Sequence, residues 1–201
     1  MAIVAKSSGN GTTFEPIEAG TYGATCVSMI HIGTYEETVQ GKTRKANRVY
    51  LTFEVPEVTF EDAESGEELP RKVGVELTLS MNEKATLRKF LDSWRGKAFT
   101  NAEAESFDIT KLLGKPCMLT ITEKTAASGN VYNKITGTAK APKGLTVPAP
   151  TTDLFEFNFD LFAADPAILE RVPEFIQEKI RQTDEFAAPV VMDEGEDEAL
   201  F

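Results

Sequence analysis

The chain is poor in the residues that most often carry catalysis and metal binding. Its 201 residues include one histidine, two cysteines and one tryptophan. Protein metal sites need several converging ligands, and nucleophilic catalysis needs a nucleophile beside a base. The single histidine, His31, has no such partner in any motif near it. We therefore expect no metal, no cofactor, no catalytic residue and no enzymatic activity.

Long apolar runs and cysteine motifs are also missing. No run approaches the ~20 residues that a helix needs to span a bilayer, and residues 1–14 lack the charged start and apolar stretch of a secretory signal. Cys26 and Cys117 lie in apolar runs without metal-type spacing, which is typical of buried thiols in a reducing compartment. The sequence therefore predicts a cytoplasmic protein without a membrane partner.

The charge is distributed unevenly along the chain. The net charge is −11, yet residues 1–150 hold 18 basic and 18 acidic side chains, whereas residues 151–201 hold 3 and 14. Six of the acids before residue 150 fall within Glu57–Glu68, so the remaining body is mildly basic. A basic body with an acidic appendage favours a nucleic-acid partner.

Alternating apolar residues predict five strands. The predicted strands are Thr21–Ile32 (bent or bulged at Gly23), Arg48–Val55, Lys72–Ser80, Cys117–Glu123 and Val131–Ala139. The polar segment Gly33–Asn47 is predicted to connect the first two strands as a loop. The segment Thr125–Asn130 is predicted to be a turn.

A helix is predicted between the third and fourth strands. Leu87, Phe90, Leu91 and Trp94 recur at helical spacing, Ser80 and Glu83 form a capping-box pattern, and Gly96 is a stop signal. Thr100 and Glu103 repeat the capping pattern for a shorter helix. The order of three strands, a helix and two strands is that of an OB-fold, a five-stranded partly open barrel. The fold class expected is mostly β.

The remaining chain is divided by composition. We expect a flexible N-terminus at 1–20, an OB-fold domain at 21–144, a linker with a helical arm at 145–186, and a disordered acidic tail at 187–201. Asp165 with Pro166, and Pro173, are predicted helix starts. The arm could dimerise, cap the binding groove or complete the core, and its apolar residues are predicted to pack back on the barrel: Ile168, Leu169, Val172, Phe175, Ile176 and Ile180.

Two segments combine cations with aromatic rings, as proteins that bind single strands do. On an OB barrel the face of strands 2 and 3 and the loops joining strands 1–2 and 4–5 bind oligonucleotides. The predicted DNA-binding residues lie in those two connections and beside them: Tyr35, Lys42, Arg44, Lys45, Arg48, Tyr50, Lys124, Tyr132 and Lys134.

Plainer interpretations stand beside these. A basic loop of this length is often only solvated, and Tyr50 could be ordinary barrel surface. The cations Arg88, Lys89, Arg95 and Lys97 could simply pair with neighbouring acids such as Asp92, and Trp94 is predicted to be core.

The chain ends in "DEGEDEALF", and this tip resembles that of the single-stranded DNA-binding proteins of bacteria and of T7-like phages, which join an OB barrel to an acidic tail with a final Phe. The segments "GTYEETVQGK", "VYLTFEV", "NEKATLRKFLDSWRGKAF" and "KLLGKPCMLTI" are also similar to a family of small phage proteins thought to act in replication or recombination. The bacterial tip carries Ile-Pro before Phe, where this chain has Ala199 and Leu200.

The resemblance implies that the tip recruits replication or recombination proteins to covered single-stranded DNA, in the host cell cytoplasm if the chain is phage-encoded. The residues implied are Asp193, Glu194, Glu196, Asp197, Glu198, Leu200 and Phe201. A homo-oligomer is possible. The alternatives left open are a virion structural or assembly protein, a tail that only aids solubility, and, as the least favoured, a nuclease or other enzyme.

Overall fold

The computed structural model describes residues 15–39, 41–63 and 65–187. Its strands are β1 (Gly20–Val39), β2 (Lys42–Glu61), β3 (Glu68–Thr78), β4 (Pro116–Thr125), β5 (Val131–Ala139) and β6 (Phe155–Phe157). Its helices are α1 (Thr86–Arg95), α2 (Asn101–Glu105), η1 (Ile109–Leu112), α3 (Phe159–Ala164), η2 (Pro166–Arg171), α4 (Glu174–Ile180) and α5 (Asp184–Ala187). The predicted order of three strands, helix and two strands is confirmed, as is the mostly β class.

The strands form one sheet in the order β3-β2-β1-β4-β5, and β6 also pairs with β1. All pairs are antiparallel except β1–β6, which is parallel and matches Ser28 with Phe155. Elements β3 and β5 lie near each other, but no hydrogen-bonded ladder joins them in the part of the chain that the structure describes. The sheet is therefore not closed along that seam.

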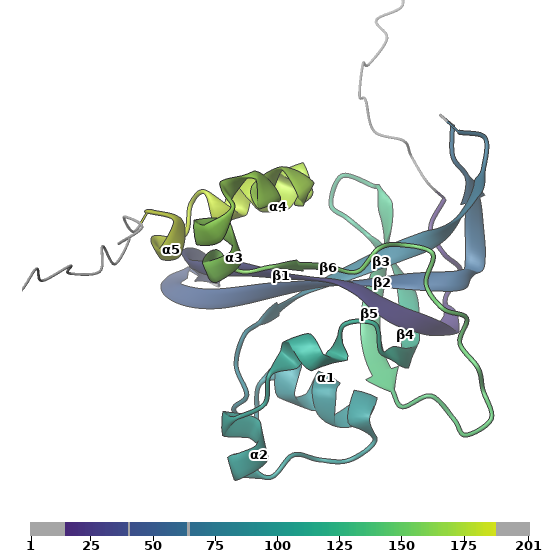
Figure 1. Ribbon diagram of the computed structural model, residues 1–201, viewed down its shortest axis with the longest axis horizontal. Coiled ribbons are helices and arrows are strands. Elements are labelled where there is room, and N and C mark those ends of the chain that lie inside the picture. Colours follow the sequence, from purple (N-terminus) through teal and green to yellow (C-terminus); the bar gives the residue numbers. More distant parts are fainter. Residues whose placement is uncertain (1–14, 40, 64, 188–201) are drawn as a thin grey trace, which may run out of the picture.

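The predicted loop Gly33–Asn47 is wrong, because β1 and β2 continue through it as one long hairpin (Figure 1). Glu36 pairs with Lys45, Glu37 with Arg44, and Thr38 with Thr43. Opposite charges and threonines facing across strands stabilise such pairs, and Gly41 has the positive φ of 75° that a tight turn needs. The segment is polar because most of its side chains are exposed or partly exposed on the hairpin, and not because it forms a loop.

A bulge in β1 divides its apolar residues between the two faces of the sheet. The register with β2 shifts between Cys26 and Ser28 and again between His31 and Gly33, so the predicted bulge site at Gly23 is wrong. An inserted residue reverses the alternation that follows it. Cys26 and Met29 consequently join one core, whereas Ile30 joins a second core on the opposite face.

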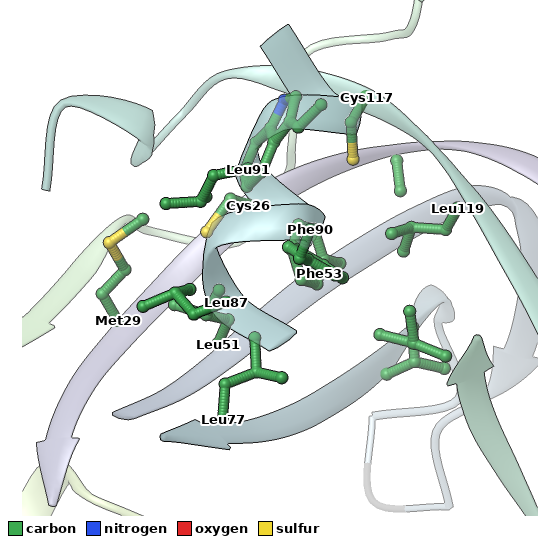
Figure 2. Close-up of a cluster of buried hydrophobic side chains, with 14 of the residues drawn as sticks. Cys26, Met29, Leu51, Phe53, Leu77, Leu87, Phe90, Leu91, Cys117 and Leu119 are labelled. Atoms are coloured by element: carbon green, nitrogen blue, oxygen red, sulfur yellow. The ribbon is translucent and has the colours of Figure 1, made fainter. Parts of the chain in front are cut away.

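The main core lies between the sheet and α1 (Figure 2). Leu87, Phe90, Leu91 and Trp94 of α1 pack on Phe53 and its neighbours, as the helical spacing predicts. Gly96 ends the helix with φ 68°, but α1 begins at Thr86 after an N-cap without a side-chain hydrogen bond. The Ser80–Glu83 capping box is therefore wrong, while the Thr100–Glu103 box at α2 is confirmed.

The C-terminal arm, residues 154–187, covers the opposite face of the β1–β2 hairpin (Figure 1). Asp165 caps η2 and Pro173 precedes α4, as predicted. The second core consists of Ile30, Ile32, Phe157, Leu169, Val172, Ile176 and Ile180, with Ile168 partly buried beside it. Burying a large aliphatic side chain or a phenyl ring contributes roughly 1.5–3 kcal/mol, so this cluster fastens the arm firmly. Phe175 differs from the prediction, since it is exposed.

Candidate nucleic-acid interface

The hairpin of β4 and β5 presents one of the two predicted basic and aromatic groups. Lys124 pairs with Tyr132, and Lys134 pairs with Thr122. Residues directly opposite each other share a face, and so do residues two apart in a strand. Lys124, Tyr132 and Lys134 therefore lie on one face of this hairpin.

That face points away from the main core. Ile121 and Ile135 occupy the opposite face and are buried, and Asn133 on that same side exchanges hydrogen bonds with the backbone of Ile17 at 2.8 and 2.7 Å. Tyr132 is 50% exposed, and both Lys124 and Lys134 are exposed. Neither lysine has an ion-pair partner among residues 15–39, 41–63 and 65–187. The two charges and the phenol ring are free to meet a ligand.

The cations of the β1–β2 hairpin are mostly paired with carboxylates. Arg44 Nη2 lies 2.7 Å from Glu37 Oε1, and Arg48 bonds the other oxygen of Glu37. Lys45 Nζ lies 2.7 Å from Asp184 Oδ2 at the end of the arm. Lys42 is exposed and has no ion pair within the described residues. Of the four cations predicted here, only Lys42 is unpaired.

Glu37 and Glu76 each accept hydrogen bonds from two side chains. A hydrogen bond from Arg48 is the largest cause of the lowered pKa of Glu37. Glu76 in β3 accepts hydrogen bonds from the Lys179 ammonium at 2.5 Å and from the Tyr35 hydroxyl at 2.7 Å. Burial, followed by the bond to Glu76, raises the pKa of Tyr35 to about 12. The β1–β2 cations are thus largely neutralised by the protein itself.

The two tyrosines predicted for this region support the arm. Tyr35 and Tyr50 are half-buried against the second core. Tyr50 packs edge-to-face on Phe175, with ring centroids 5.6 Å apart and planes at 76°. The structure therefore gives these rings packing partners, whereas it leaves Tyr132 half exposed.

The linker before the arm crosses β2 at Glu54, on the face of the sheet opposite the main core. This carboxylate is buried and accepts backbone hydrogen bonds from Thr151 at 2.9 Å and Thr152 at 3.0 Å. Burial alone would raise the pKa of Glu54, but the hydrogen bonds outweigh it and lower the pKa. An ionised Glu54 therefore anchors the linker to β2.

A groove of about 630 Å³ beside this anchor was not predicted. Phe60, Leu69, Pro70, Arg71 and Lys72 line it together with Thr151 and Thr152. Its signal in the sequence is the pair Arg71–Lys72, which lies between the acidic stretch and the alternating apolar residues that begin at Val73. The acids Glu57, Glu61, Asp62, Glu67 and Glu68 lie at this end of β2 and β3, which opposes phosphate binding. None of the residues that line the groove belongs to the β4–β5 hairpin.

Three of the four cations around α1 make contacts within the protein. Arg88 is buried, donates to the carbonyls of Met81 and Phe99, and lies 3.3 Å from Asp92. Arg95 Nη2 lies 3.4 Å from Glu103 Oε1, and Lys97 lies 4.0 Å from the same oxygen. Lys89 is exposed without an ion-pair partner in the described residues.

Three other predicted side chains are structural. Trp94 is 4% exposed and donates its indole N–H to the carbonyl of Pro116 at 3.0 Å, which confirms its place in the core. Cys26 and Cys117 are buried free thiols, as predicted, and burial raises the pKa of Cys26 to about 12.

The remaining sequence predictions concern the histidine, metal binding, a membrane span and the acidic tail. His31 Nε2 lies 2.8 Å from Asn47 Oδ1. Within the described residues there is no group of three or more His, Cys, Asp or Glu placed to hold a metal ion, and no helix is long and apolar enough to cross a membrane. The tail residues lie outside the described range: Asp193, Glu194, Glu196, Asp197, Glu198, Leu200 and Phe201.

Comparison with protein-family models, with curated proteins and with solved structures gives no match for this chain.

Proposed function

We propose that this chain is a sequence-independent single-stranded DNA-binding protein on an OB-type framework, acting without catalysis. The observation that carries the proposal is the exposed face of the β4–β5 hairpin. There, Lys124, Tyr132 and Lys134 combine two unneutralised cations with a half-exposed ring. Cations bind phosphates of any sequence, and a stacked base contributes roughly 1–3 kcal/mol whatever its identity.

Several features support the OB-type framework. The sheet order β3-β2-β1-β4-β5, with a helix between the third and fourth strands and with β3 near β5, is compatible with a partly open five-stranded barrel. On that framework the connection between strands 4 and 5 is one of the ligand-binding elements, and it is the one that the arm leaves exposed.

In this proposal the acidic tip acts as a recruitment element. Leu200 and the ring of Phe201 would fill a shallow apolar pocket on a replication or recombination protein. The acids from Asp193 to Glu198 would speed the encounter with a basic surface, an effect that weakens with salt.

One observation favours a second candidate, a virion structural or assembly protein. Three of the four cations around the β1–β2 turn are neutralised within the chain. This neutralisation would weaken phosphate binding by a DNA-binding hairpin, whereas an assembly protein tolerates it. The two candidates differ in whether the β4–β5 cations matter to binding.

Fluorescence anisotropy of labelled dT30 and of a matching duplex tests the proposal. Intact protein and a chain cut after Val190 are titrated at two salt concentrations. We expect salt-sensitive binding to the single strand in preference to the duplex, strengthened by the truncation because the tail competes for the same cations. Absence of binding by both chains would contradict the proposal and favour the assembly role.

A further inference from the structure

The part of β5 that carries the candidate interface has β4 as its one ladder partner in the described structure. Within the described residues, two β5 side chains also form hydrogen bonds to other segments of the chain. Thr138 donates to the Phe90 carbonyl of α1 at 2.7 Å, near the C-terminal end of the strand. Asn133 bonds to Ile17, near the N-terminal end. Asn133 therefore holds the end of β5 that carries the candidate interface.

The contact between Asn133 and Ile17 has the form of a small β-bridge. Asn133 Oδ1 accepts the backbone N–H of Ile17 at 2.8 Å, and Nδ2 donates to the Ile17 carbonyl at 2.7 Å. Among side chains, only those of Asn and Gln offer an amide N–H donor beside a carbonyl acceptor. The two residues lie 116 positions apart in the chain, and Ile17 precedes β1. We call this pair of bonds the Asn133 clamp.

Ile17 is a firm anchor for the clamp. It is 2% exposed and belongs to the main core together with Ile135 of β5. Asn133 stands between Tyr132 and Lys134 in the strand. Because successive side chains of a strand point to opposite faces, a residue held from the core side sets the direction of its two neighbours on the other face.

We propose that Asn133 is a positioning residue for the candidate interface: by clamping β5 to Ile17, it fixes the orientation in which Tyr132 and Lys134 meet a single strand. This inference rests on the proposed function and adds to it how the site is held. Asn133 points to the core side and contacts no ligand. Without the clamp this end of the hairpin is free to tilt, and the affinity falls with the fraction of molecules in the binding orientation.

Hydrogen exchange followed by NMR tests the clamp on the unaltered chain. Within the described residues, the Ile17 N–H has Asn133 Oδ1 as its acceptor and lies outside the strand ladders. We expect this amide to be protected from exchange about as well as the amides of the β4–β5 ladder, and to lose that protection in Asn133→Ala. An unprotected Ile17 amide in the unaltered chain would overturn the proposal.

Binding of dT30 tests the positioning role. Asn133→Ala should weaken binding about 3- to 30-fold, because two hydrogen bonds of ordinary net strength no longer hold the hairpin. The slope of log affinity against log salt should stay the same, since every lysine is still present. Thr138→Val is the matched control, because it removes the other side-chain bond from β5, to Phe90 on α1. It should bind dT30 like the unaltered chain, and thermal unfolding establishes that both variants are folded.

A double-mutant cycle separates positioning from general destabilisation. Because Asn133 acts through the ring beside it, Asn133→Ala should cost much less affinity in a chain that already carries Tyr132→Ala. Additive losses, an unchanged affinity of Asn133→Ala, or an equal loss in Thr138→Val would each refute the positioning role and leave the proposed function standing. If the unaltered chain itself does not bind dT30, the proposed function fails, and the positioning role fails with it.

Discussion

The β1–β2 and β4–β5 hairpins have similar local sequences and different surroundings. Each places tyrosine and lysine within a few residues of a tight turn. At β1–β2 the carboxylates of Glu37, Glu76 and Asp184 neutralise most of the cations, and the arm packs on the tyrosines. At β4–β5 no described residue does either. The availability of a charge is thus decided by the partners that the fold places beside it, which are Glu37 across the same hairpin for Arg44 and Arg48 and Asp184 of the arm for Lys45.

A large loss of affinity is expected from reversing the β4–β5 charges. The double substitution Lys124→Glu and Lys134→Glu should weaken dT30 binding roughly 10- to 100-fold at low salt, because two attractions to phosphate become repulsions. The slope of log affinity against log salt should become shallower by about 0.7 for each lysine that no longer neutralises a phosphate. Anisotropy titrations at several salt concentrations measure both quantities.

The control changes the same net charge elsewhere. Lys84→Glu with Lys89→Glu alters exposed lysines beside and on α1, on the side of the sheet opposite the arm (Figure 1). It should leave the affinity within about threefold of the unaltered chain, given the screening of distant charges. Equal losses in both double variants would mean that only the overall charge matters.

Substituting one tyrosine in each hairpin should distinguish the roles of the two hairpins further. Tyr132→Ala is expected to weaken dT30 binding roughly 5- to 150-fold through loss of a stacked base. Tyr35→Phe removes only the hydroxyl that bonds Glu76, so it should leave dT30 affinity unchanged and lower the free energy of unfolding by about 1 kcal/mol. Affinity and chemical denaturation are measured on both variants. The reverse pattern would place the bases on the β1–β2 hairpin.

Neutralising the β1–β2 cations should have a small effect on binding. Replacing Lys42, Arg44 and Lys45 together by glutamine is expected to weaken dT30 binding no more than about threefold, since Arg44 and Lys45 are already paired. Composition alone predicts a much larger loss. A loss as large as that of the β4–β5 double reversal would show that DNA displaces Glu37 and Asp184.

The smallest expected effect is the pH dependence of the arm. Glu185 accepts the backbone N–H and the hydroxyl of Thr34, both at 2.7 Å; burial opposes ionisation, yet these bonds lower its pKa. A carboxyl with a lowered folded pKa stabilises the protein above its unfolded pKa of about 4.3. That contribution is lost as the pH falls through the lowered value.

Thermal unfolding from pH 7 down to pH 3 tests this. Glu185→Gln should cost about 1–2 kcal/mol at pH 7 and should show a shallower decline in acid than the unaltered chain. Parallel curves for the two proteins would mean that Glu185 does not contribute to the acid dependence. Binding of dT30 at neutral pH should be unaffected, because Glu185 joins the arm to β1, away from the β4–β5 hairpin.

Local periodicity predicted the parts of the fold that depend on local packing. The spacing of Leu87, Phe90, Leu91 and Trp94 located α1, and the alternation in Val131–Ala139 gave β5 its bounds. The failures came from long-range effects. Polar residues at 33–47 form strands because they pair with one another, and the bulge after Cys26 moves Ile30 to the second core.

The sequence predicted the residue types of the candidate site, but not which of these side chains remain exposed and unpaired. Lys124, Tyr132 and Lys134 could be chosen by residue type and spacing, and the structure brings them to one face. Their sequence does not distinguish them from Lys45 and Tyr35, because the carboxylates of Asp184 and Glu76 reach that hairpin only through tertiary packing. The exposure of Phe175 likewise depends on how α4 settles on Tyr50.

Photocrosslinking of a dT30 strand that carries photoreactive thymidine analogues, followed by mass spectrometry of the peptides, tests the central claim most directly. We predict crosslinks in the β4–β5 hairpin, residues 116–139, at low and moderate salt. Crosslinks confined to residues 33–50 would contradict the assignment of the interface, and no crosslink at any salt concentration would contradict single-strand binding itself.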